Sequence, residues 1–107
     1  MIHSQASVAT TMAEQYLFKL AKHFAKKVPV HQQPRLASIE FEFGHCVLEV
    51  QGPSGDAPVP PQAQQTLHVR CHSADAQQLA RLHSVLESHL ALMTRREPLQ
   101  LHWETLA

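Results

Sequence analysis

Two histidines and one cysteine are the side chains whose chemistry points most directly to a functional site. His23, Cys46 and His89 are far apart in the chain, but the histidines flank the apolar stripes of two predicted helices and the cysteine lies on the apolar face of a predicted strand. Imidazole and thiolate groups are good ligands for zinc, copper and ferrous iron. If both helices lie on one sheet, the three side chains would meet, and we expect a metal site for iron or zinc.

The same three residues allow two other interpretations. A thiolate beside an imidazolium is a reactive nucleophile, so a small enzyme that uses Cys46 or His23 is the first alternative. A buried thiol that only fills space, with both histidines hydrogen-bonded at the helix edges, is the second.

The helix that carries His23 is predicted over residues 11–28. Apolar residues recur on one face at helical spacing, namely Leu17, Leu20, Ala21, Phe24 and Val28. Thr11 and Glu14 have the spacing of a capping box, and Pro29 cannot continue the helix.

A polar row follows one edge of this apolar stripe. Tyr16, His23 and Lys27 are spaced at i, i+7 and i+11, so they share one edge of the helix. We expect the imidazole to bind a small ligand, with the ammonium group of Lys27 balancing an anionic charge. The alternative is a boundary row whose polar ends are simply in water.

Several short motifs together resemble a known bacterial family. The pattern Tyr16-Leu17-x-x-Leu20-x-x-His23-Phe24-x-x-Lys27 is followed by Phe43-Gly44-x-Cys46, Leu86-x-x-His89-Leu90, Glu97 and Trp103. In order and spacing they resemble the family called domain of unknown function 2218, over nearly the whole chain. The resemblance adds Glu97 to the expected ligand-binding residues. Some related domains occur beside siderophore-interacting, flavin-dependent ferric reductases, which implies an accessory role in iron handling and such a reductase as a partner.

Length and composition limit the classes of function. A chain of 107 residues is predicted to form one domain over 1–107. Its net charge of zero argues against nucleic acid as a partner. No apolar run approaches the roughly 20 residues that cross a membrane, and the first residues do not resemble a signal peptide. We therefore expect a cytoplasmic protein whose Cys46 and Cys71 are reduced.

The remaining sequence predicts an α+β fold. Alternating apolar residues predict a hairpin over 37–50, a third strand over 66–72 and a last strand over 99–104, while helical spacing predicts a second helix over 75–93. Residues 29–36 form a polar connection, and the proline-rich segment 52–65 is predicted to be a mobile loop. The expected architecture is a two-layer sandwich in the order (β)-α-β-β-β-α-β. One mainly antiparallel sheet of four strands, or five with a short edge strand at 7–10, has both helices on one face. The last strand should pair in parallel with the third.

The second face of this sheet would then be open and rich in charge. The side chains expected there are Glu40, Glu42, His45, Glu49, His68, Arg70, His72, His102 and Glu104. Such a face could bind a metal, a polar ligand or a second copy of the chain, or it could be a solvated surface. Our leading interpretation is a non-catalytic module for a small ligand or metal, and a structural homodimer is a further alternative.

Overall fold

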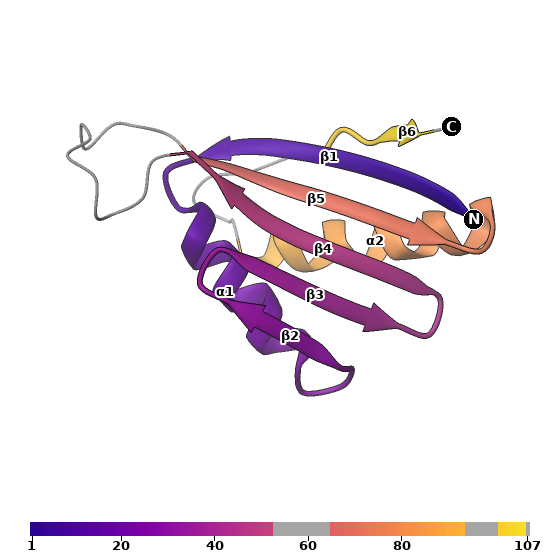
Figure 1. Cartoon of the computed structure of the whole chain (residues 1–107), viewed down its shortest axis with the longest axis horizontal. Coiled ribbons are helices and arrows are strands. Elements are labelled where there is room, and N and C mark those ends of the chain that lie inside the picture. Colours follow the sequence, from indigo (N-terminus) through magenta and orange to yellow (C-terminus); the bar gives the residue numbers. More distant parts are fainter. Residues whose placement is uncertain (53–64, 94–100, 107) are drawn as a thin grey trace.

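The computed structural model describes residues 1–52, 65–93 and 101–106. Within them the chain forms six strands and two helices. In chain order these are β1 (Ile2–Thr10), α1 (Ala13–Phe24), β2 (Val30–Gln33), β3 (Leu36–Phe41), β4 (Gly44–Gln51), β5 (Gln65–Ser73), α2 (Ala76–Met93) and β6 (Glu104–Leu106). The strands build one antiparallel sheet in the order β2-β3-β4-β5-β1-β6, shown in Figure 1.

Both helices cover the same face of the sheet, so the predicted two-layer α+β sandwich is confirmed (Figure 1). The core is formed where the helix stripes meet the inward side chains of the strands. In β4, for example, Cys46, Leu48 and Val50 are buried, whereas Val47 and Glu49 between them are half-buried on the open face. No helix among the described residues is long and apolar enough to cross a membrane.

The first strand is longer and more central than predicted. β1 pairs with β5 along its whole length and lies between β5 and β6, so it is not a short edge strand. Its buried positions include Ser4 and Ala6, which are small or polar. Strand prediction relies on alternating large apolar residues, and this segment turns small side chains toward the core instead.

A second strand falls in the segment predicted to be a polar connection. Val30–Gln33 forms β2, which pairs with β3 at the edge of the sheet. His31, Gln32 and Gln33 are exposed there. An edge strand has only one neighbour and needs little apolar surface, so its sequence resembles a loop.

The last strand also differs from the prediction. β6 begins at Glu104 and pairs antiparallel with β1, not in parallel with β5. β5 already has β4 and β1 as its two neighbours in the sheet, so the chain that follows α2 pairs with the free edge of β1. The predicted mobile loop at 52–65 lies almost wholly outside the described residues, and Gln65 is the first residue of β5.

The first helix is shorter at both ends than the predicted range of 11–28. α1 begins at Ala13 without a side-chain cap, so the Thr11–Glu14 capping box is not formed. Thr10 Oγ1 instead accepts a hydrogen bond from the Met12 N–H at 3.1 Å. After Phe24 the chain makes turns before β2, in which the Val28 N–H still donates to the Phe24 carbonyl at 2.9 Å.

Candidate functional site

Two of the three predicted metal ligands meet. His23, near the end of α1, and His89, in the last turns of α2, have ring centroids 4.6 Å apart. His89 Nδ1 donates to the Val85 carbonyl at 2.7 Å, so in its neutral form the lone pair is on Nε2. Phe24 packs against both rings, with centroid distances of 5.3 and 4.8 Å.

Cys46 does not join this histidine pair. It is fully buried in β4, directly opposite Cys71 of β5, and both thiols are free. A hydrogen bond with Cys71, together with burial, raises the pKa of the Cys46 thiol well above its usual range. A nucleophilic or metal-binding cysteine needs the opposite shift. The described part of the chain contains no group of three His, Cys, Asp or Glu side chains that could hold a metal ion, so the predicted three-residue site is wrong.

Of the remaining predicted ligand-binding residues, Lys27 lies near enough to His23 to lower its pKa. Tyr16 is only 3 % exposed and belongs to the core, where its hydroxyl donates to Met12 Sδ at 3.7 Å. Lys27 is exposed in the turn that follows α1. Glu97 lies outside the described residues.

The surroundings of the helix histidines are positive. Burial, His89, Lys27 and Lys26 together lower the pKa of His23. A metal cation placed there would meet the same repulsion from the two lysines. The pair is therefore electrostatically less suited to a cation than its ring geometry indicates.

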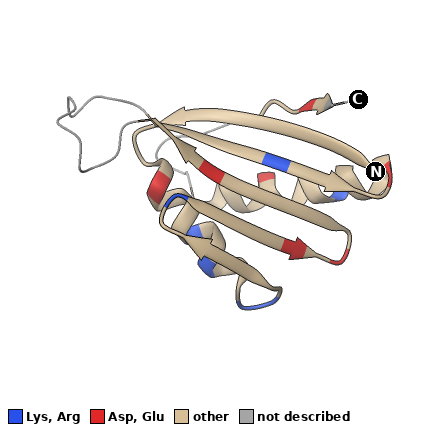
Figure 2. Cartoon of the chain, viewed as in Figure 1, with Lys and Arg blue, Asp and Glu red and all other residues tan. Residues whose placement is uncertain are grey.

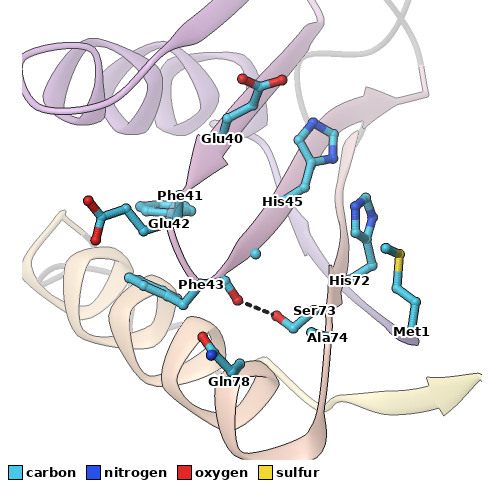
Figure 3. A pocket seen from close by; sticks show the side chains of 11 residues that line it. Met1, Glu40, Phe41, Glu42, Phe43, His45, His72, Ser73, Ala74 and Gln78 are labelled. Atoms are coloured by element: carbon cyan, nitrogen blue, oxygen red, sulfur yellow. Dashed lines mark hydrogen bonds between the residues drawn. The ribbon is translucent and has the colours of Figure 1, made fainter.

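A second histidine pair lines a pocket of about 600 Å³ at the end of the β3–β4 hairpin (Figure 3). His45 and His72 extend from neighbouring strands to the same side of the sheet, beside Glu40. Glu42 from the hairpin turn adds a second carboxylate. The described residues that line this pocket include no lysine or arginine. Arg70 lines the adjoining pocket that shares both histidines, and its guanidinium is paired with Glu49 at 3.2 Å. The charged side chains of the pocket itself are therefore carboxylates, which suit a cation.

Strand register creates this cluster. Glu40 of β3 lies opposite His45 of β4, His45 lies opposite His72 of β5, and His72 lies opposite His3 of β1. The ring centroids of His45 and His72 are 4.9 Å apart, and those of His72 and His3 are 5.4 Å apart. Ser38 Oγ forms a hydrogen bond with His45 Nε2 at 2.7 Å and so orients that ring.

The hairpin turn that forms one wall is tightly packed. The turn of the hairpin predicted over 37–50 consists of Glu42 and Phe43. Ser73 Oγ donates to the Phe43 carbonyl at 2.8 Å, which ties the turn to the end of β5 (Figure 3). Phe43 stacks on Phe41 at 5.3 Å, and the Arg81 guanidinium lies 4.4 Å from the Phe43 ring centroid.

The sequence predicted the face of the sheet for some of the residues that line this pocket. Glu40, His45 and His72 were predicted on the open face from the period-two pattern, and the structure places them together. His3 was missed because β1 was not predicted as a full strand. Two other residues predicted on the open face, His102 and Glu104, are not among the residues that line this pocket. His102 precedes β6, and Glu104 of β6 lies opposite Gln5 of β1. Gln5 Nε2 donates a hydrogen bond to the Glu104 carboxylate at 3.4 Å. The proximity of His45 and His72 could only come from the register of β4 with β5.

A further polar cluster joins β1, α2 and the segment before β6. Ser4 Oγ and His83 Nε2 are 2.7 Å apart. The His83 ring stacks on Trp103 with centroids 3.8 Å apart, and Trp103 Nε1 donates to Glu87 Oε1 at 2.7 Å. Ser4 is fully buried, so the cluster satisfies buried polar groups and holds the Trp103 segment against α2.

Three of these histidines make stability depend on pH. Burial is the largest cause that lowers the pKa of His23, His72 and His83 below 6.5, although Glu87 partly opposes it at His83. The unfolded chain therefore binds more protons than the folded protein below about pH 6.5. We expect the free energy of unfolding to fall as the pH falls from about 7 to about 5.

Urea denaturation at a series of pH values measures this dependence. The His83→Gln variant should show a shallower slope over the same range, because one of the three groups has been removed. A parent protein whose stability stays constant or increases on acidification would contradict the expected sign.

Comparison with known proteins agrees with this fold. The chain is similar to the protein of the NMR structure of PA4090 from Pseudomonas aeruginosa, with a TM-score of 0.71 and 27 % sequence identity. The match covers 97 % of this chain and 96 % of that one. No curated protein matches the sequence. The family model described as "Uncharacterized protein conserved in bacteria (DUF2218)" matches residues 5–104, and the chain therefore belongs to that family of conserved bacterial proteins, as its motifs predicted.

Proposed function

We propose that this protein is a binding module that holds a divalent transition-metal ion in the pocket at the end of the β3–β4 hairpin. His45 and His72 are the proposed ligands, and Glu40 supplies negative charge. The observation that supports this most directly is the cross-strand imidazole pair, 4.9 Å between ring centroids, in a pocket whose described lining carries carboxylates and no lysine or arginine.

The lowered pKa of His72 and the hydrogen bond to His45 both suit metal ligation. Burial, His45 and His3 lower the pKa of His72, which favours the neutral form that binds metals. The hydrogen bond between Ser38 and His45 resembles the outer contacts that orient metal-binding imidazoles. Because the described residues contain no preformed group of three ligands, water or a bound small molecule would complete the coordination.

Zinc and ferrous iron, the ions expected from the sequence, are both compatible with imidazole ligands. A role in siderophore handling and a partnership with a siderophore-interacting reductase stay predictions from the family resemblance. The alternative of an enzyme with Cys46 as its nucleophile is disfavoured, because the Cys46 thiol is buried and its raised pKa keeps it protonated.

Isothermal titration of untagged protein with Zn²⁺ tests the proposal. We expect His72→Gln and His45→Gln each to weaken binding at least tenfold, or about 1.4 kcal/mol, because each removes one of two protein ligands. The control is His31→Gln, which changes an exposed histidine on β2 outside the pocket and should bind Zn²⁺ as the parent does.

The helix histidines provide the second comparison. His89→Gln should leave Zn²⁺ affinity unchanged if the ion is held in the pocket. Loss of binding in His89→Gln, with normal binding in His72→Gln, would overturn the proposal and place the ion between the helices. A parent protein that binds no Zn²⁺, Co²⁺ or Fe²⁺ would overturn it altogether.

A further inference from the structure

The outer face of α1 carries a large apolar side chain that the fold does not use. Phe18 is 52 % exposed, whereas its neighbours Leu17 and Leu20 are buried in the core. It lies in a groove of about 600 Å³ lined by Glu14, Gln15, Phe18, Lys19, Lys22 and Pro34. The groove therefore runs between α1 and the turn that joins β2 to β3.

The walls of this groove are held in place. Arg35 Nε lies 3.4 Å from Glu14 Oε1, which ties the β2–β3 turn to the first turn of α1. Arg35 also donates from Nη2 to the Gly52 carbonyl at 2.8 Å, and its own carbonyl accepts from the Val50 N–H at 2.9 Å. A groove whose walls are already joined by such contacts needs less ordering when a partner binds.

The groove is surrounded by positive charge. Lys19, Lys22 and Lys26 are exposed on or just after α1, and Lys22 Nζ lies 5.9 Å from the Phe18 ring centroid. Figure 2 shows lysines and arginines on α1 and the adjacent turns, while acidic residues predominate on β3, β4 and the β3–β4 turn. Among the described lining residues Glu14 is the only carboxylate, and it is paired with Arg35.

We propose that this face of α1 is a docking surface for an acidic segment of a partner protein, with one apolar side chain of that segment seated between Phe18 and Pro34. Opposite charges would steer the partner and fix its position, while the aromatic ring would supply the buried contact. A membrane surface is the less suitable occupant, because Phe18 is the one large apolar side chain exposed on α1, and interfacial helices present a whole apolar face.

The test uses a short synthetic peptide in which glutamates flank a central Leu-Trp pair, and a matched peptide with lysines in place of the glutamates. Each is titrated into ¹⁵N-labelled protein and followed by NMR. We expect the acidic peptide to shift the amide signals of α1, Gln33 and Arg35, and to bind more weakly as salt increases. The lysine peptide should cause no such shifts.

Variants distinguish peptide binding in the groove from nonspecific binding. Phe18→Ser should weaken binding of the acidic peptide at least about fivefold, and Lys22→Gln should weaken it to a smaller extent. Leu92→Ser, which changes a 61 % exposed leucine on α2, should bind like the parent. Equal binding by Phe18→Ser and parent, equal binding of both peptides, or binding only to phosphatidylserine vesicles would each overturn the proposal.

Discussion

Replacing Leu86 by alanine is expected to lower the free energy of unfolding by about 2–5 kcal/mol. Leu86 is 2 % exposed on the side of α2 that faces the sheet, within the single cluster of buried apolar residues. Removing most of its side chain would lose the transfer free energy of the buried atoms and leave a cavity that the close-packed core only partly fills. Urea denaturation of parent and variant gives the difference directly.

The same helix offers a matched control. Leu92 is 61 % exposed, so Leu92→Ala makes the same chemical change and the same change in helix propensity without opening a cavity. We expect its free energy of unfolding to stay within about 0.5 kcal/mol of the parent. If the two variants were equally stable, the assignment of the buried side of α2 would be wrong.

Replacing Gly44 by alanine is expected to destabilise the protein by about 1–3 kcal/mol, and to damage the proposed metal pocket as well. An added Cβ would lie 2.7 Å from the His72 carbonyl oxygen and 3.1 Å from Leu82 Cδ2, and it would also collide with the Ser73 side chain. Since the first of these atoms belongs to the backbone, the clash cannot be relieved by a change of rotamer. The cause is steric, because among the described glycines only Gly52 has a positive φ.

Two measurements follow this substitution. Urea denaturation should show the loss of stability, while Ser7→Ala, at an exposed position of β1, should differ from the parent by no more than about 0.5 kcal/mol. Zn²⁺ titration of Gly44→Ala should show weaker binding, because the His72 backbone must move away from the new methyl group. A Gly44→Ala variant with parental stability would show that β4 and β5 are not packed this closely.

The two histidine pairs illustrate how surroundings decide chemistry. His23 and His89 are at least as close as His45 and His72, with ring centroids 4.6 and 4.9 Å apart respectively. Lys26 and Lys27 lower the pKa of His23 in the first pair. Glu40 and Glu42 line the pocket of the second pair, and the nearby Arg70 is paired with Glu49. Like charges repel a bound cation and opposite charges attract it, so the pocket pair is the better candidate despite the family motif around His23.

The sequence by itself determined the α+β class, both helices and three of the strands. The periods of 3.6 and two residues at α1, α2 and the β3–β4 hairpin come from large apolar side chains that must leave water, and these patterns are local. Most of β1 and all of β2 escaped prediction for the complementary reason. Small inward residues such as Ser4 and Ala6, and the polar edge of β2, contain little of that signal.

Only the tertiary structure decided which side chains meet. His45 and His72 are neighbours because of the register between β4 and β5, and Cys46 faces Cys71 for the same reason. A strand pattern assigns each residue to a face but not to a partner on the next strand. The identity of those partners depends on the order of strands across the sheet, which places β1 between β5 and β6. That order is set by the packing of the whole chain, so no local pattern in the sequence could supply it.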